Sequence, residues 1–347
     1  MKFDEQLWLA KSKLQFLLTP KQRRVRLEIA TDGRQLTYLL VSLQALGYAL
    51  QVVDSPMLFR ELVCLRLSKS PPFIYGGAPR ECAFVISDQP QVIAQAVREG
   101  IPGLFLDADY FSPGRKEMRM PYFMHPMIYH RGWHRLAVPP AENARPIRLG
   151  FFGTRDPDFY TRDFHFPMLN REQILAAFLS GFEDLIWEVD GPVGEWLPKP
   201  VAVAMDVKGG DRAGKSFLTL ADYLQALRRC DFFLTPPGKV MPFSHNLIEG
   251  MAAGCIPVLN YPEYLDPPLE PGVNCLAFRD VAGLNKTVES LLKMDPSEIF
   301  KMRAAVLQYY RQHLEPGQWL GNLLRKAGQN QNLLVNAEEV SLSLVNH

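Results

Sequence analysis

Short apolar runs alternate with longer amphipathic segments over most of the chain. Short apolar runs bounded by turn residues are typical of buried strands, and apolar positions three and four apart are typical of helices. The pattern predicts strands at residues 24–30, 49–54, 72–77, 81–88, 101–109, 147–154, 184–192, 200–207, 231–238, 256–259 and 274–280. It predicts helices at residues 34–47, 56–67, 90–100, 171–182, 219–230, 282–294 and 296–313.

Strands that alternate with helices of this length favour parallel pairing, because a parallel pair needs a crossover connection. The predicted fold class is therefore α/β, with two Rossmann-like doubly wound domains facing a cleft. The expected organisation is an N-terminal helix, a first Rossmann-like domain, a linker without clear periodicity, a second Rossmann-like domain and a C-terminal tail that could return to the first domain: 1–22, 23–110, 111–146, 147–315 and 316–347.

Composition and charge are those of a globular protein. The chain has 347 residues, 47% hydrophobic, with a formal net charge of +1. This balance disfavours nucleic acid as a partner. Five cysteines without a CxxC pair indicate free thiols in a reducing, cytoplasmic setting.

The apolar segment 7–18 contains Lys11 and Lys13, which argue against a signal peptide. No apolar run is long enough to span a bilayer. The segment could make peripheral contact with a membrane surface, although a helix packed on the first domain is the preferred interpretation.

A polar entry to a short predicted helix follows the strand at 231–238. Gly238 and Lys239 lie in the turn, Ser244, His245 and Asn246 precede the helix, and Glu249 lies about one turn in. A helix N-terminus offers unpaired N–H groups suited to a diphosphate, and Glu249 could accept both hydroxyls of a ribose. Asn246 and Glu249 also resemble a capping box, in which Glu249 would only stabilise the start of the helix.

Residues 231–278 resemble the donor-site motif of GT-B glycosyltransferases, in particular exostosin-like and glycosyl transferase group 1-like families. The resemblance rests on Pro237-Gly238, Ser244 and the run Glu249-Gly250-Met251-Ala252-Ala253-Gly254-Cys255-Ile256-Pro257-Val258. It implies that Glu249 binds the donor ribose and that Ser244 to Asn246 approach the diphosphate. The chain departs from the family pattern at Met241, where many retaining enzymes have a second glutamate, and at Asn246, where exostosin-like sequences have arginine.

Two further turns are candidates for donor contacts. Gly153, Thr154 and Arg155 end the first strand of the second domain, where Arg155 could face a phosphate or could be a surface arginine. The loop 209–217 contains Lys215 and lacks the spacing of a P-loop, which favours a cleft loop over an ATP site.

General-base candidates lie in the first half of the chain. Asp32 and Asp88 follow predicted strands, and His125 lies in the linker; Asp32 could instead cap a helix, and His125 could be an ordinary packed histidine. Asp107 and Asp109 form an Asp-x-Asp pair of the kind that binds metal in GT-A enzymes, but a solvated or capping role is preferred, so no metal site is predicted.

The function predicted from these features is transfer of a sugar from a nucleotide-sugar donor, UDP- or GDP-linked, to the hydroxyl of a carbohydrate or other acceptor. The scheme needs neither metal nor cofactor. Two alternatives remain open: a nucleotide-sugar epimerase on the same fold, and a non-catalytic nucleotide- or sugar-binding protein. A dehydrogenase is disfavoured, because neither first turn carries GxGxxG.

Overall fold

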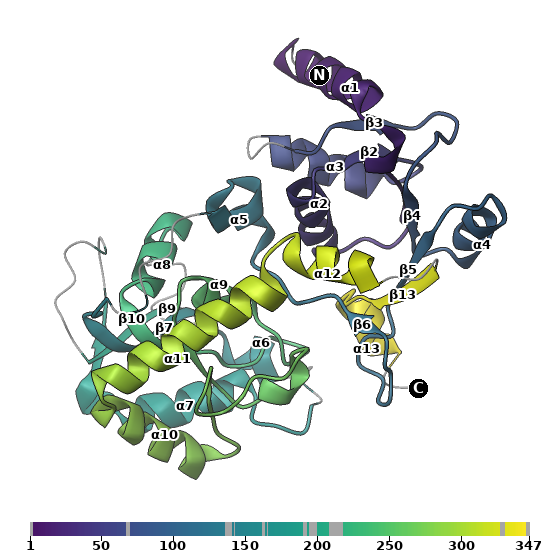
Figure 1. Ribbon diagram of the computed structural model, residues 1–347. Coiled ribbons are helices and arrows are strands. Elements are labelled where there is room, and N and C mark those ends of the chain that lie inside the picture. Colours follow the sequence, from purple (N-terminus) through teal and green to yellow (C-terminus); the bar gives the residue numbers. More distant parts are fainter. Residues whose placement is uncertain are drawn as a thin grey trace. The chain divides into compact units, whose positions relative to one another are not determined.

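The protein is known from a computed structural model, whose elements are labelled in Figure 1. The structure describes residues 3–66, 70–135, 141, 143–161, 164, 166–189, 193, 200–207, 218–326 and 330–344. The chain divides into two compact units. Unit 1 comprises Met1–Pro121, His125–Arg135 and Glu315–His347, and unit 2 comprises Tyr122–Met124 and Leu136–Leu314.

Unit 1 is built on a seven-stranded sheet in the order β3-β2-β1-β4-β5-β13-β6. Its strands are β1 (Arg24–Glu28), β2 (Ala49–Val52), β3 (Phe73–Tyr75), β4 (Phe84–Ser87), β5 (Gly103–Asp107), β6 (Met118–Arg119) and β13 (Asn330–Leu334). Every neighbouring pair recorded in the described residues is parallel. The helices of this unit are α1 (Phe3–Leu18), α2 (Gln35–Ala45), α3 (Pro56–Leu65), α4 (Pro90–Arg98), α5 (Pro126–His130), α12 (Gln318–Lys326) and α13 (Glu339–Ser343).

The C-terminal segment contributes to the core of unit 1. β13 lies between β5 and β6 and pairs with both. Trp319 of α12 donates from its indole nitrogen to the hydroxyl of Ser42 at 2.9 Å and stacks on Tyr38, so α12 is fixed on α2. Because β13 lies inside the sheet and not at its edge, the sheet of unit 1 needs residues that are more than 200 positions away from its first strands.

Unit 2 is built on a six-stranded sheet in the order β12-β11-β10-β7-β9-β8, again parallel throughout the described pairs. Its strands are β7 (Ile147–Arg155), β8 (Ile186–Glu188), β9 (Val201–Val207), β10 (Cys230–Leu234), β11 (Ile256–Leu259) and β12 (Leu276–Ala277). Its helices are α6 (Pro157–Thr161), α7 (Arg171–Gly181), α8 (Leu220–Leu227), α9 (His245–Ala252), α10 (Val281–Lys293) and α11 (Pro296–Tyr309). β10 and β11 are buried along their whole length, as expected for strands covered on both faces.

The predicted α/β class with two parallel, helix-covered sheets is confirmed. Two local predictions differ from the structure. The region 111–146, predicted to lack regular structure, contains β6, α5 and a 3-10 helix at Trp133–Arg135. These elements have two to five residues, which is too short to produce a detectable period. The helix predicted at 296–313 ends at Tyr309, and a π-helix follows at Tyr310–Leu314.

A buried ion pair fixes α11 to the sheet of unit 2. The guanidinium of Arg303 is fully buried and donates to the carboxylate of Asp231 in β10, which also accepts from Arg148 at 3.1 Å. Arg303 donates as well to the carbonyl oxygens of Ala141 and Asn143, each at 2.6 Å. Burial, followed by repulsion from Arg145, lowers the pKa of Arg303 to about 10.

Within the part of the chain that the structure describes, no helix combines the length and apolar character needed to cross a membrane.

The burial of His134 predicts that the stability of unit 1 depends on pH. Its Nδ1 is buried without a hydrogen-bond partner among the described residues, and burial, with nearby Arg135, lowers its pKa to about 4. Between this value and its ordinary pKa of 6.5 the unfolded chain binds the proton and the folded one does not. The free energy of unfolding should therefore decrease as the pH is lowered from 6.5 to about 4, by at most about 3 kcal/mol in total.

The test is urea unfolding at pH 7, 5.5 and 4.5 for the wild type and for His134→Phe, which keeps an aromatic ring next to Tyr129. The variant should lose less stability than the wild type on acidification. Parallel curves for the two proteins would contradict the assignment.

Candidate functional site

The order of strands in unit 2 has its switch point between β7 and β10, and in open parallel sheets a crevice is expected at the carboxyl ends of such strands. From β7 the chain continues to β8 and β9 on one side, and from β10 it continues to β11 and β12 on the other. In open parallel sheets the connections on either side of such a switch point diverge and leave room for a ligand. Of the two segments predicted to contact a donor, 153–155 forms the carboxyl end of β7 and 238–249 follows the neighbouring strand β10.

Backbone packing fixes the turn between β10 and α9. A Cβ atom on Gly238 would lie 2.3 Å from the carbonyl oxygen of Phe243, so only glycine fits there. Ser244 is the N-cap of α9, and its side chain makes no capping hydrogen bond to the helix. Lys239 lies in this turn and is half-buried.

Arg171 joins the two segments at the crevice. It is the first residue of α7, a helix that begins with a capping box formed by Asn170 and Gln173. Its Nε donates to the carbonyl oxygen of Pro237 at 2.9 Å, and its Nη2 donates to the hydroxyl of Ser244 at 3.0 Å. Its Nη1 lies 3.4 Å from the carbonyl oxygen of Thr154.

Arg171 is only 4% exposed, and the structure records no carboxylate partner for it among the described residues. Tyr160 covers the guanidinium, whose carbon lies 4.4 Å from the ring centroid. A buried cation held by neutral oxygen atoms produces a positive potential at the crevice.

Glu249 is 3% exposed and accepts a hydrogen bond of 2.7 Å from the hydroxyl of Tyr223. Burial and then the Glu249 carboxylate raise the pKa of Tyr223 well above its ordinary value, while Arg171 acts in the opposite direction. A buried carboxylate therefore contacts this phenol, and the charge of Arg171 acts on the same group. The alternative capping-box role of Glu249 is not seen, because α9 starts at His245 and Glu249 contacts α8 instead.

Asn246 and His245 connect the start of α9 to neighbouring segments of unit 2. The Asn246 amide donates to the carbonyl oxygen of Phe152 at 3.0 Å, and a Cβ on Gly153 would lie 3.0 Å from the amide nitrogen. The Nδ1 of His245 lies 2.9 Å from the carbonyl oxygen of Phe123, which requires the Nδ1–H tautomer, and the ring stacks on Tyr122. Both side chains therefore position α9.

The remaining donor candidates are placed as follows. Arg155 forms a two-point ion pair with Glu172, with closest distances of 2.6 and 3.1 Å, so a carboxylate already balances its charge. Thr154 offers its carbonyl oxygen to Arg171. Lys215 and the loop 209–217 lie outside the described residues.

Much of the run from Glu249 to Val258, at the end of α9, has a structural explanation. Gly254 has φ +75°, a left-handed conformation that ends the helix, and its neighbour Cys255 donates its backbone N–H to the carbonyl oxygen of Gly250. Arg145 donates to the carbonyl oxygens of Ala253 and Cys230, which fixes the helix end to β10. These contacts account for the glycine and the buried cysteine without a ligand.

In unit 1, Asp32 and Asp88 lie at the corresponding switch point, after the neighbouring strands β1 and β4. The Asp88 carboxylate accepts from the backbone N–H groups of Ala30 and Thr31, with the shortest distance 2.6 Å, so it shapes the loop after β1. Asp32 is exposed and accepts from the backbone N–H of Gly33 at 2.8 Å. It does not cap α2, whose N-cap is Arg34.

His125 caps α5, since its Nδ1 accepts from the backbone N–H of Met127 at 3.3 Å. Burial, followed by the nearby charges of Arg34 and His130, lowers its pKa. A neutral histidine at neutral pH is the form that can accept a proton.

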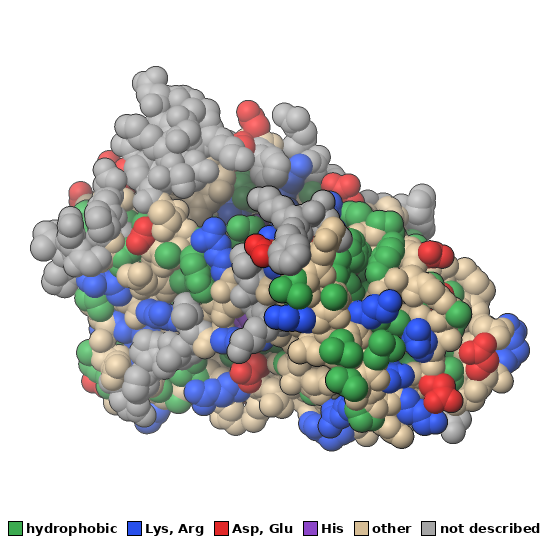
Figure 2. All heavy atoms as spheres, turned by 90° about the horizontal axis from the view of Figure 1, so that it is seen from above, with side chains coloured by type: hydrophobic (Ala, Val, Ile, Leu, Met, Phe, Trp, Pro, Cys, Tyr) green, Lys and Arg blue, Asp and Glu red, His purple; other side chains and the backbone are tan. Residues whose placement is uncertain are grey.

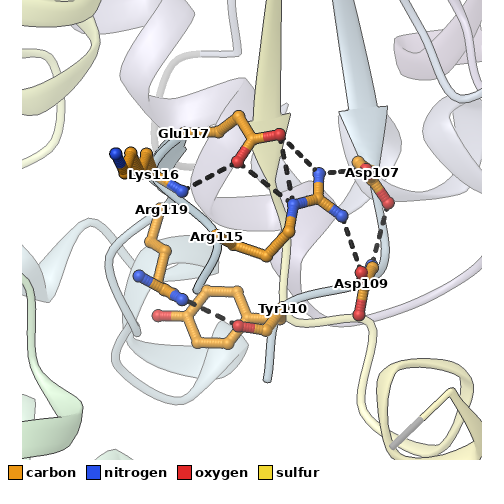
Figure 3. A network of polar contacts seen from close by, with 7 residues as sticks. All are labelled: Asp107, Asp109, Tyr110, Arg115, Lys116, Glu117 and Arg119. Atoms are coloured by element: carbon orange, nitrogen blue, oxygen red, sulfur yellow. Dashed lines mark hydrogen bonds and ion pairs between the residues drawn. The ribbon is translucent and has the colours of Figure 1, made fainter. Parts of the chain in front are cut away.

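The Asp-x-Asp pair binds an arginine (Figure 3). Arg115 forms ion pairs of 2.6 Å with Asp107 and with Asp109, and one of 2.8 Å with Glu117. These partners, Glu117 first, raise the pKa of Arg115, and Arg115 lowers that of Glu117 to about 2. The side-chain oxygens that would hold a metal thus hold a guanidinium.

Comparisons with known proteins add the following. No family model matches the chain, and no curated protein matches it in sequence. Solved structures similar to it include Anabaena HepE in complex with UDP (10% identity, TM-score 0.47, covering 88% of this chain and 100% of that one). A glycosyltransferase of Rickettsia africae (11%, 0.43, 89% and 98%) and the calicheamicin glycosyltransferase CalG4 (12%, 0.41, 88% and 98%) are also similar. The two-sheet architecture itself follows from the strand order.

Sequence reasoning missed Arg171 and Tyr223. The capping-box pattern Asn170-x-x-Gln173 marks the start of α7 and could have pointed to an arginine at the carboxyl edge of the sheet. Nothing in the sequence around Tyr223 predicts its contact with Glu249, which is 26 residues away.

Replacing Arg171 should weaken unit 2. Arg171→Leu leaves the buried carbonyl oxygen of Pro237 and the Ser244 hydroxyl without their donor, at a cost of roughly 1–3 kcal/mol for each group. Urea unfolding should show this loss, and hydrogen exchange should show faster exchange at the start of α9. The control is Lys286→Ala, an exposed position on α10 of the same unit. Wild-type stability in Arg171→Leu would show that the arginine does not hold the crevice together.

Proposed function

We propose that this chain is a glycosyltransferase of the GT-B type, transferring a sugar from a UDP- or GDP-linked donor to an acceptor hydroxyl. One observation carries the proposal: the residues of the donor-motif resemblance follow β10, beside the turn after β7, at the switch point of a parallel sheet. A resemblance in sequence and a ligand-binding position in the topology thus coincide, although neither was derived from the other.

Two sources of positive charge at the crevice support a role in stabilising a leaving nucleoside diphosphate. The N-terminus of α9 carries partial positive charge, and the buried Arg171 adds a full one behind it. Stabilising charge on the departing diphosphate is the main chemical demand of glycosyl transfer without a metal. Ser244 to Asn246 would approach the phosphates through backbone N–H groups, because their side chains serve contacts within unit 2.

Glu249 is proposed to recognise the donor ribose. The resemblance assigns this role to Glu249, whose carboxylate accepts a hydrogen bond from the Tyr223 hydroxyl. Because Glu249 is so deeply buried, Tyr223 would have to move when the ribose binds. Arg155 and Lys239 remain proposed phosphate neighbours, with Arg155 acting as part of its pair with Glu172.

The experiment is incubation of the purified chain with a panel of UDP- and GDP-sugars in EDTA, followed by separation of the products. Slow release of free sugar and nucleoside diphosphate is the expected result. A changed sugar still attached to its nucleotide would identify an epimerase, and tight binding without turnover a non-catalytic binding protein. Turnover that is absent in EDTA and restored by Mn²⁺ would contradict the metal-independent scheme.

For the acceptor side, we infer that Asp32 is the general base if the reaction inverts configuration. Asp88 is committed to two backbone N–H groups and His125 to the cap of α5, whereas Asp32 is exposed at the switch point. Asp32→Asn should lower the rate of transfer by about 10²–10⁴-fold and leave nucleotide affinity unchanged.

Asp88→Asn should instead lower stability, because it weakens the loop after β1, and His125→Ala should lower the stability of unit 1. Initial rates, nucleotide titrations and unfolding curves of the three variants separate these roles. Near-normal transfer by Asp32→Asn, or loss of transfer only in His125→Ala, would contradict the assignment of Asp32 as the general base.

A further inference from the structure

Helix α1 uses one face to pack on unit 1. Ser12 and Phe16 are buried, and the hydroxyl of Ser12 accepts from the backbone N–H of Phe73 at 2.8 Å. Trp8 lies against the ring of Phe73, with centroids 5.3 Å apart. α1 is therefore fixed next to β3, and its orientation about its own axis is set by these contacts.

The opposite face of α1 is apolar and exposed. Four leucines, at positions 7, 14, 17 and 18, are between 41% and 75% exposed. At about 100° per residue, they fall within an arc of about 100° that faces away from Ser12 and Phe16. Exposed Ala10 lies within the same arc. We call these five residues the leucine stripe.

A lysine borders the leucine stripe on each side. On the same helical projection Lys11 lies beside Leu18, and Lys13 lies on the far side of Leu17. Both lysines are exposed, and no ion pair is recorded for either among the described residues. Glu5, by contrast, is turned toward unit 1 and pairs with Arg66 at 2.6 Å.

Apolar side chains flanked by cations match the interface of an anionic membrane. The leucines can enter the boundary between headgroups and acyl chains, and the long lysine side chains can reach the phosphates beside it. On the face drawn in Figure 2, hydrophobic side chains lie next to lysine and arginine side chains.

A second copy of the chain fits the leucine stripe less well. A two-fold, antiparallel contact between two α1 helices would place their central residues, around position 11, opposite one another. Lys11 would then face Lys11, and Asp4 is the one exposed acidic side chain of α1 in the described part of the chain. Like charges opposed at the centre of a contact oppose association.

We propose that the leucine stripe, with Lys11 and Lys13, docks the protein on membrane surfaces that contain anionic lipid. The docking is peripheral, since the stripe occupies one side of a helix whose other side is packed on unit 1. The inference depends on α1 alone, so it stands or falls separately from the proposed glycosyl transfer.

The test is co-sedimentation of the full chain with vesicles of phosphatidylcholine alone and of phosphatidylcholine with phosphatidylglycerol. The wild type should bind the anionic vesicles, and binding should weaken with added salt. Leu14→Glu/Leu18→Glu and Lys11→Glu/Lys13→Glu should each lower the affinity at least about tenfold. Val97→Glu, at an exposed apolar position on α4, is the matched control and should bind like the wild type.

All the substituted side chains are exposed, so circular dichroism and unfolding curves should match those of the wild type. Equal recovery of wild type and variants with anionic vesicles, or no recovery of either, would overturn the proposal. Analytical ultracentrifugation without vesicles tests whether the leucine stripe joins two copies of the chain instead. A dimer that the leucine variants abolish would show that the leucine stripe is an interface between copies of this chain.

Discussion

The guanidinium of Arg171 is the interaction on which the candidate donor site depends. It connects the ends of β7 and β10 through the carbonyl oxygens of Thr154 and Pro237, and it holds Ser244, the N-cap of α9. It is buried, and no carboxylate forms an ion pair with it in the described residues. The same side chain thus holds the two loops together and contributes positive charge to a crevice that is proposed to receive a diphosphate.

Each of the two parallel sheets has a switch point, where the connections of two neighbouring strands run to opposite sides. In unit 1 the neighbouring strands β1 and β4 diverge in their connections, and in unit 2 β7 and β10 do so. Parallel strands place all their carboxyl ends at one edge, so residues far apart in sequence meet there. Asp88 contacting the loop after β1, and Arg171 contacting the turn after β10, are two results of this rule. In each unit, side chains shape the loops where a ligand would bind.

The sequence located turns and helix starts well and the contacts of side chains less well. The turn at Gly238 and the helix entry at Ser244 could be predicted, because turn residues and capping residues leave local signals. The carboxylate of Glu249 could not be assigned, because its partner Tyr223 lies on another helix. For Asp107 and Asp109 the sequence favours a solvated or capping role over metal binding, but their side chains form ion pairs with Arg115.

By itself the sequence determined the class of the fold, since the spacing of apolar runs and amphipathic segments depends only on local periodicity. It also determined which turns follow strands. Only the tertiary structure decided which strands are neighbours, because β13 enters the sheet of unit 1 from the far end of the chain. It likewise decided that Arg171 joins two loops and that one face of α1 is left uncovered. Pairing, burial and charge compensation depend on contacts between distant residues, and no local pattern in the chain encodes them.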